Sequence, residues 1–123
     1  MIASVPWETL FQDRFAYFDG GMGTLLQEMG LEGGERPERW NLDHPARVRS
    51  VHDAYLRSGA EVIAANTFGA TEEHLGGDAA ACMRAGVRIA KEAVEAAGRG
   101  FAAIDMGGLG RLIQPYGDLP FEE

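Results

Sequence analysis

Apolar positions along this chain of 123 residues follow two alternating patterns. Short, largely apolar runs predict strands at residues 15–18, 61–65 and 101–104. The run at 62–65 is apolar on both faces, which is typical of a parallel sheet covered by helices. Between these runs, apolar residues recur at the spacing of one face of a helix. Strands that alternate with helices predict an α/β fold built on a parallel sheet.

Helices are expected in the segments that flank the three strands. Their predicted ranges are 6–14, 23–29, 43–58 and 79–97. Gly30 is a natural end for the second helix, Asp43 can cap the third, and Pro45 suits its first turn. Residues 32–41 and the tail at 115–123 are expected to be loops. The two long helices should bury stripes formed by Val48, Val51 and Tyr55, and by Met83, Val87, Ala90 and Val94.

Composition and charge exclude several functional classes. The formal net charge of -8 argues against a nucleic-acid partner, because phosphate binding needs clustered basic residues. No apolar run approaches the roughly 20 residues of a membrane span, and no signal-peptide pattern opens the chain. Cys82 is the only cysteine, so an internal disulfide is excluded and a reducing, cytoplasmic setting is expected.

The junction after the first strand is the most informative candidate site. Asp19 follows residues 15–18 directly, and Gly20 and Gly21 come next. Ligand sites of parallel α/β folds lie at such strand ends. The carboxylate and the backbone N–H groups can hold the ammonium and carboxylate groups of a ligand. An equally good interpretation is a turn whose aspartate caps the next helix.

A second polar junction follows the strand at 61–65. Asn66 and Thr67 offer an amide and a hydroxyl, with Phe68 next, and the polar groups can face the same ligand. Taken alone, the pattern favours a simpler interpretation, in which Asn and Thr side chains bond to the backbone of a turn.

Other well-known sites are missing from the sequence. The glycines after Asp19 lack the later glycine of a dinucleotide-binding fingerprint, and there is no P-loop lysine. The three histidines, His44, His52 and His74, show no metal-ligand spacing, and His44 and His52 are expected at the surface or in a cap. Cys82 has no neighbouring His or Cys and is expected to be a buried, inert thiol.

Five short motifs occur in order along nearly the whole chain. They are Asp19-Gly20-Gly21-Met22-Gly23-Thr24, Arg39-Trp40-Asn41-Leu42 with Pro45, His52 to Tyr55 leading into Ser58-Gly59-Ala60-Glu61, Asn66-Thr67-Phe68-Gly69-Ala70, and Asp105-Met106-Gly107 with Gly110. Together they resemble the homocysteine S-methyltransferases, including the homocysteine-binding domain of cobalamin-dependent methionine synthase.

The resemblance implies a TIM-type barrel of eight β/α units and transfer of a methyl group to the thiol of homocysteine, which gives methionine. Such barrels take about 250 residues. Residues 1–123 are therefore expected to form a partial homocysteine-binding domain, the amino-terminal three β/α units of a longer enzyme. The methyl donor stays open among methylcobalamin, a betaine-like donor and S-methylmethionine, and cobalamin would act as a methyl carrier.

The resemblance also implies zinc, which binds the homocysteine thiol and lowers its pKa. In the family, cysteines from later strands hold the zinc, and Cys82 does not match them. We therefore expect no metal ligand in this chain and no activity from this chain alone.

The family's amino-acid site carries over to six residues. Asp19 matches an acid that contacts the homocysteine amino group, and Gly20 and Gly21 match backbone N–H groups that meet its carboxylate. Asn66, Thr67 and Phe68 match the second strand end that lines the pocket. Two departures weaken the match: Ala64-Ala65 stands where the family usually has a polar residue, often Thr, and Gly108 stands where Pro is common.

A non-catalytic remnant that binds a small molecule or a partner chain is the alternative. An open parallel edge leaves backbone N–H and C=O groups that seek pairing. We therefore predict that the isolated chain self-associates at high concentration, as measured by light scattering. A stable, monodisperse monomer under those conditions would contradict this expectation.

Overall fold

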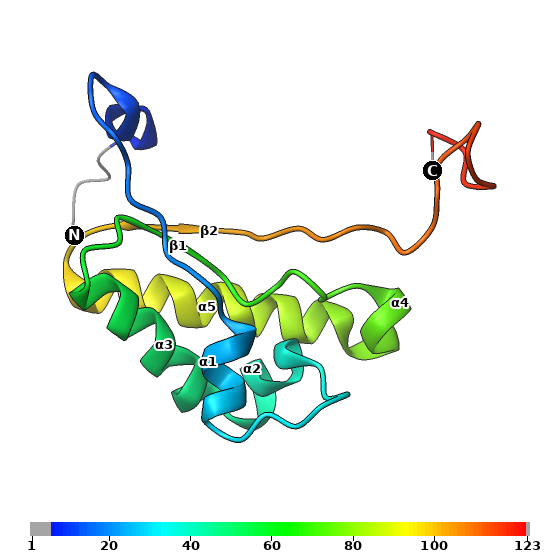
Figure 1. The fold of residues 1–123 in the computed structure, drawn as a ribbon, viewed down its shortest axis with the longest axis horizontal. Helices are drawn as coiled ribbons and strands as arrows, with labels where there is room; N and C mark the ends of the chain where they lie inside the picture. Colours follow the sequence, from blue (N-terminus) through cyan, green and yellow to red (C-terminus); the bar gives the residue numbers. More distant parts are fainter. Residues whose placement is uncertain (1–5, 123) are drawn as a thin grey trace.

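The computed structural model describes residues 6–122, and its α/β arrangement places a small parallel sheet against a layer of helices (Figure 1). In chain order the elements are the 3-10 helix η1 (Trp7–Phe11), α1 (Gly23–Glu28), the 3-10 helix η2 (Pro37–Arg39), α2 (Trp40–Asp43), α3 (Pro45–Arg57), β1 (Val62–Ala64), α4 (Glu72–Leu75), the 3-10 helix η3 (Gly76–Asp78), α5 (Ala79–Ala97) and β2 (Phe101–Ala103). Within residues 6–122, no helix has the length and apolar character needed to cross a membrane.

The sheet consists of β1 and β2, which pair in parallel. Val62 lies opposite Phe101, and the register continues to Ala64 opposite Ala103. The connection between the two strands runs through α5, so this unit has the strand–helix–strand order that the sequence predicts. Both strands are one or two residues shorter than the apolar runs that predict them.

The expected strand at residues 15–18 is present only as one parallel bridge, between Phe18 and Val62. The N–H of Val62 donates to the carbonyl of Tyr17 at 3.2 Å, and the N–H of Asp19 donates to the carbonyl of Val62 at 3.0 Å. Regular pairing goes no further, because the side chains of Tyr17 and Phe18 are 65% and 57% exposed and little packing supports a longer strand. The three-strand prediction is thus reduced to two strands and a bridged segment.

Helices α1, α2, α3 and α5 lie on one side of the strands (Figure 1). The bounds of α5 agree with the predicted range at both ends. Gly98 ends this helix with a left-handed φ of 70°, and its N–H donates to the carbonyl of Val94 at 3.0 Å. Alanine is frequent in α5; it favours helix formation, and its short side chain keeps the diameter of the helix small.

The buried face of α5 differs from the predicted stripe. Its buried residues are Ala79, Cys82, Ala85, Gly86, Ile89, Ala90 and Ala93, whereas Met83, Val87 and Val94 are only half-buried. Small residues allow the backbone of α5 to approach its neighbours closely, so the larger side chains lie beside the contact rather than in it. In α3 the predicted stripe is correct, with Val48 and Val51 fully buried and Tyr55 packed against them.

Two apolar clusters form most of the core between the helices and under the sheet. The first contains Leu26, Leu31, Trp40, Val48, Val51 and Ile89, and the second contains Leu56, Ala60, Ile63, Ala65, Ala90 and Ala93. Gly30 ends the segment of α1 as expected, with a φ of 108°, and the N–H of Leu31 donates to the carbonyl of Leu26 at 2.9 Å.

The predicted loop at residues 32–41 is partly wrong, because η2 begins at Pro37 and α2 follows from Trp40. Trp40 is 3% exposed and anchors this segment in the core, which overrides the loop-like composition. Asp43 is the last residue of α2 and does not cap α3, whose preceding residue is His44 without a side-chain cap bond. Pro45 does occupy the first turn of α3, as expected.

Beyond β2 the chain first runs on along the helical layer and then turns away from it into a small terminal turn (Figure 1). Ile113 and Leu119 form a bridge there, but Met106, Leu112 and Tyr116 are 80%, 66% and 88% exposed. The loop predicted at 115–123 is confirmed up to residue 122, and residue 123 lies outside the described part.

His52 corrects the expectation of a surface or capping role. Its ring is fully buried on α3, and neither ring nitrogen has a hydrogen-bond partner within residues 6–122. Burial lowers the pKa of His52 to about 4, because the charged form loses its hydration. The single sequence could not distinguish this histidine from an exposed one, since it lies on the edge of an otherwise apolar stripe.

This burial makes the stability of the protein depend on pH. The pKa of His52 is lower in the folded state than in the unfolded state. The neutral ring therefore contributes fully to the free energy of unfolding above about pH 6.5, and this contribution is lost as the pH falls towards 4. We predict a loss of about 3 kcal/mol across this window for wild type. Urea denaturation at several pH values measures it. His52→Leu should flatten the dependence, whereas the control His74→Gln, at an exposed position, should retain it.

Candidate functional site

A cleft of about 290 Å³ lies at the carboxyl ends of the strands. All six predicted site residues line it: Asp19, Gly20, Gly21, Asn66, Thr67 and Phe68. The structure therefore brings together two junctions that are more than 40 residues apart in the sequence. Glu38 and Asp105 also line the cleft, from η2 and from the segment after β2.

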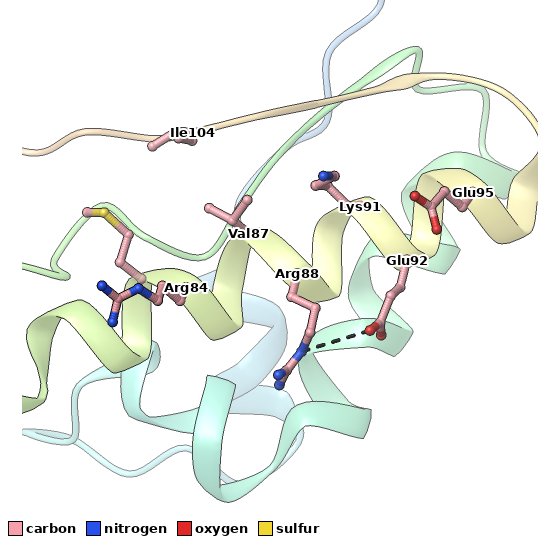
Figure 2. A pocket seen from close by; sticks show the side chains of 8 residues that line it. Arg84, Val87, Arg88, Lys91, Glu92, Glu95 and Ile104 are labelled. Atoms are coloured by element: carbon pink, nitrogen blue, oxygen red, sulfur yellow. Dashed lines mark ion pairs between the residues drawn. The ribbon is translucent and has the colours of Figure 1, made fainter. Parts of the chain in front are cut away.

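A larger groove of about 570 Å³ lies between α5 and Ile104 (Figure 2). Its charged side chains are exposed and of both signs, and Arg88 and Glu92 form an ion pair at 3.8 Å. Exposed ion pairs of this kind contribute little to stability and do not hold their side chains in a fixed geometry. The smaller cleft is the better candidate because its polar groups are buried or half-buried and fixed by hydrogen bonds.

Asp19 lines the cleft, is half-buried and bonds across to β1. Its Oδ2 accepts a hydrogen bond from the N–H of Ala64 at 3.0 Å. Helix α1 begins after Met22 without any side-chain cap bond, so Asp19 does not cap it. Burial raises the pKa of Asp19 and the nearby carboxylate of Asp105 raises it further, while the bond from Ala64 opposes both. Such a carboxylate gains electrostatically when a cation enters the cleft.

The Gly20-Gly21 turn is held by Tyr55 of α3. The hydroxyl of Tyr55 donates to the carbonyl of Gly21 at 2.8 Å. A Cβ atom at Gly20 would lie 2.8 Å from the same hydroxyl oxygen, so only glycine fits without a shift. The sequence predicted Tyr55 only as part of the apolar stripe of α3. It gave no sign of a role for the Tyr55 hydroxyl, because the carbonyl of Gly21 that this hydroxyl binds is distant in the chain.

The polar side chains of Asn66 and Thr67 hold the wall of the cleft together. Asn66 Nδ2 donates to Asn41 Oδ1 at 2.9 Å and to the carbonyl of Pro37 at 2.8 Å. The hydroxyl of Thr67 donates to the carbonyl of Asp105 at 2.7 Å, and the N–H of Asp105 donates back to Thr67 Oγ1 at 3.1 Å. The simpler interpretation, in which both side chains bond to the nearby backbone of a turn, is therefore wrong for Asn66, and for Thr67 it holds only for a long bond of 3.4 Å to the carbonyl of Ala65.

Phe68 is the exposed member of this junction, with 60% of its surface accessible. It directly follows two buried residues, Asn66 and Thr67, and all three line the cleft. Its backbone carbonyl accepts the N–H of Gly107 at 3.1 Å. A Cβ at Gly107 would come within 2.2 Å of that carbonyl, so glycine is required for this approach.

Two acids of the cleft were not predicted as site residues. Glu38 lay in an expected loop, and no local pattern indicated that it is buried. Asp105 did carry a signal, since it opens a glycine-rich junction after the third apolar run. With Asp19 they place three carboxylates around a cleft whose lining includes no Lys, Arg or His.

The described residues offer no metal centre. Within residues 6–122, no group of three or more His, Cys, Asp or Glu side chains is arranged to hold a metal ion. Cys82 is fully buried, and burial raises the pKa of its thiol, as expected for an inert cysteine. These residues therefore do not fit a zinc site.

Comparison with known proteins gives both a family and a fold. The family model described as homocysteine S-methyltransferase matches residues 17–123. A solved structure of the homocysteine methyltransferase MmuM from Escherichia coli, in a metallated form, is similar with a TM-score of 0.73 and 24% identity over 86% of this chain. An oxidized form of the same enzyme has a TM-score of 0.68 and 23% identity over 80% of this chain. The chain spans 42% and 40% of the length of these two structures.

The close approach of α5 to Asn41 and Asn66 predicts that only glycine is tolerated at position 86. A Cβ there would lie 2.7 Å from Asn41 Nδ2 and 3.0 Å from the carbonyl of Asn66. We expect Gly86→Ala to lower the free energy of unfolding by about 1–3 kcal/mol, despite the better helix propensity of alanine. Urea denaturation measures this, with Gly33→Ala as the control, since nothing lies within 4 Å of a Cβ there. Equal stability of the two variants would contradict the requirement.

Proposed function

Because the chain belongs to the homocysteine S-methyltransferase family, we propose that it binds the amino-acid end of homocysteine in an enzyme that methylates the homocysteine thiol. The reaction of that enzyme yields methionine. The observation that carries the proposal is the cleft at the strand ends, which has three carboxylates and no basic side chain in its lining. Such a cleft favours a ligand that brings an ammonium group.

Asp19 is the proposed acceptor for the ammonium group of homocysteine. One of its oxygens already accepts the N–H of Ala64, so the carboxylate is fixed and its other oxygen is available to a ligand. Charge-assisted bonds of this kind are among the stronger contacts in a binding site. The raised pKa of Asp19 supports the same role, because a cation next to it relieves the desolvation of the carboxylate.

The backbone N–H groups of Gly20 and Gly21 are the proposed contacts for the carboxylate of homocysteine. Both residues are exposed at the cleft, and Tyr55 fixes their turn. Asn66 and Thr67 support the opposite wall, and the exposed ring of Phe68 is positioned to cover the apolar part of the ligand. In this proposal the six residues orient the ligand and take no part in the chemical step.

The proposal extends to a barrel. The segment of Phe18, β1 and β2 follow one another in the chain and lie side by side in parallel. Neighbouring strands of a TIM-type barrel have this same arrangement. We infer that these segments are its first three β/α units. Zinc supplies thiol activation in such enzymes, but the described residues do not fit a zinc site, so the role proposed for this chain is binding and orientation.

A second candidate is a non-catalytic chain that associates with a partner. The observation in its favour is the exposed apolar surface on the segment before α1 and on the tail, where Phe15 and Tyr116 are 86% and 88% exposed. A partner strand could cover this surface and pair with the open sheet edges.

Asp19→Asn tests the binding role. The variant keeps an oxygen for the N–H of Ala64 and removes the charge, so we expect homocysteine affinity to fall by about tenfold or more, measured by calorimetry. Wild-type affinity should also fall as acid protonates Asp19, at a higher pH than for an ordinary aspartate. Asp118→Asn, at a side chain 82% exposed, is the control. An unchanged affinity in Asp19→Asn would remove Asp19 from the site.

A further inference from the structure

The short helix η1 carries an exposed pair of aromatic rings. Trp7 and Phe11 are 61% and 53% exposed, and their rings meet edge to face with centroids 6.4 Å apart. The helix, drawn in blue, stands apart from the helical layer (Figure 1). The acids Glu8 and Asp13 lie in the same stretch, and residues 7–13 contain no basic side chain. An acidic segment with two exposed rings is suited to a contact, since aromatic residues are enriched in the cores of protein–protein interfaces.

The groove between α5 and Ile104 (the α5 groove) has the complementary character. Ile104 lies across it from Val87 (Figure 2), and Met83 is its third apolar residue. Its charged side chains are three cations and two acids: Arg84, Arg88, Lys91, Glu92 and Glu95. Arg88 pairs with Glu92, whereas Arg84 and Lys91 have no ion-pair partner within residues 6–122. The α5 groove is therefore locally positive in a chain whose net charge is -8.

Size and charge allow η1 to occupy the α5 groove. A groove of about 570 Å³ is in the size range of pockets that hold drug-sized molecules, so it can take up two aromatic side chains. Each ring would bury roughly 150–250 Å². That area is small beside the roughly 800 Å² that each partner buries in a standard interface, so the contact is weak and reversible. Glu8 and Asp13 flank the rings and can pair with the cations of the groove.

The η1 helix and the α5 groove of one chain lie at opposite edges of the sheet. The segment after η1 is fixed at the edge of β1 that faces away from β2, where Arg14 pairs with Glu61 and Phe18 bridges Val62. The groove lies at the other edge, because Ile104 directly follows β2. In the single chain the rings of η1 therefore remain exposed, and contact between η1 and a groove needs a second molecule.

We propose that η1 of one copy of this chain docks in the α5 groove of a second copy. Trp7 and Phe11 then cover the apolar floor of the groove, and the acids of η1 meet its cations. The contact is head to tail, because each copy offers η1 at one edge and the groove at the other. It does not depend on the proposed function, since no residue of η1 or of the α5 groove lines the cleft at the strand ends.

Two variants each remove one half of the contact. Trp7→Ser lacks the larger ring of η1 but keeps the groove, whereas Ile104→Glu keeps η1 and places a repelling carboxylate in the groove. We expect each to weaken self-association by about tenfold or more, measured by sedimentation equilibrium. The matched controls are Tyr116→Ser and Leu109→Glu, at side chains 88% and 59% exposed outside both surfaces, and they should associate like wild type.

A mixture of the two variants tests the contact directly. The η1 of Ile104→Glu fits the groove of Trp7→Ser, so the emission of Trp7 should shift to the blue when Trp7→Ser is added. The emission should stay in place when more Ile104→Glu, or the double variant, is added instead. Trp7→Ser has only the buried Trp40, and its own spectrum is subtracted as background. Recovery in the mixture also shows that both variants are folded.

Three results would overturn the proposal. Emission of Trp7 in wild type that does not change with protein concentration means that η1 either stays in solvent or docks within its own chain. Equal self-association of wild type and both variants places the contact elsewhere, such as at the open edge of the sheet. A mixture of Trp7→Ser and Ile104→Glu that leaves Trp7 emission unchanged shows that η1 and the groove are not partners.

Discussion

The buried amide pair of Asn41 and Asn66 determines how the distant segments of this protein meet. Asn66 Nδ2 donates to Asn41 Oδ1 at 2.9 Å, and Asn41 Nδ2 donates to the carbonyls of Asn66 and Cys82 at 2.7 and 2.9 Å. The pair therefore joins α2, the end of β1 and α5 in one network. Each amide is at most 5% exposed, so the loss of one partner leaves buried polar atoms unsatisfied.

Packing on one side of the sheet explains most of the remaining architecture. The helices cover one face of β1 and β2, and small residues of α5 let them approach closely (Figure 1). The edge next to β1 meets only the segment of Phe18, whose apolar side chains remain exposed. Both strands end before the apolar runs of the sequence do, and in β2 no residue is fully buried.

The sequence predicted best where local signals suffice. The helix over 79–97 was correct at both ends because alanine-rich periodicity and Gly98 act within the segment itself. The strand at 15–18 was overestimated, since its pairing depends on packing that periodicity does not report. The burial of Trp40 likewise turned an expected loop into η2 and α2.

The same division applies to the candidate site. The six residues that the sequence brought forward all line the cleft, because strand ends of a parallel sheet converge at one edge. It missed Glu38 and the hydroxyl of Tyr55, and it misplaced His52, because burial and partners at those positions come from segments distant in the chain. Side-chain environment, unlike strand order, is not encoded in a local pattern.

The turn at Gly20-Gly21 is tied to α3 through Tyr55, while the facing wall depends on α2 and α5. No local segment can therefore form the cleft by itself, and the site has a high contact order. The cleft is complete only when these sequence-distant contacts have closed, so any ligand it accepts recognises only the fully folded chain. Occupancy of the cleft is then thermodynamically linked to global folding, so that a ligand acts as a stabiliser of the entire α/β unit.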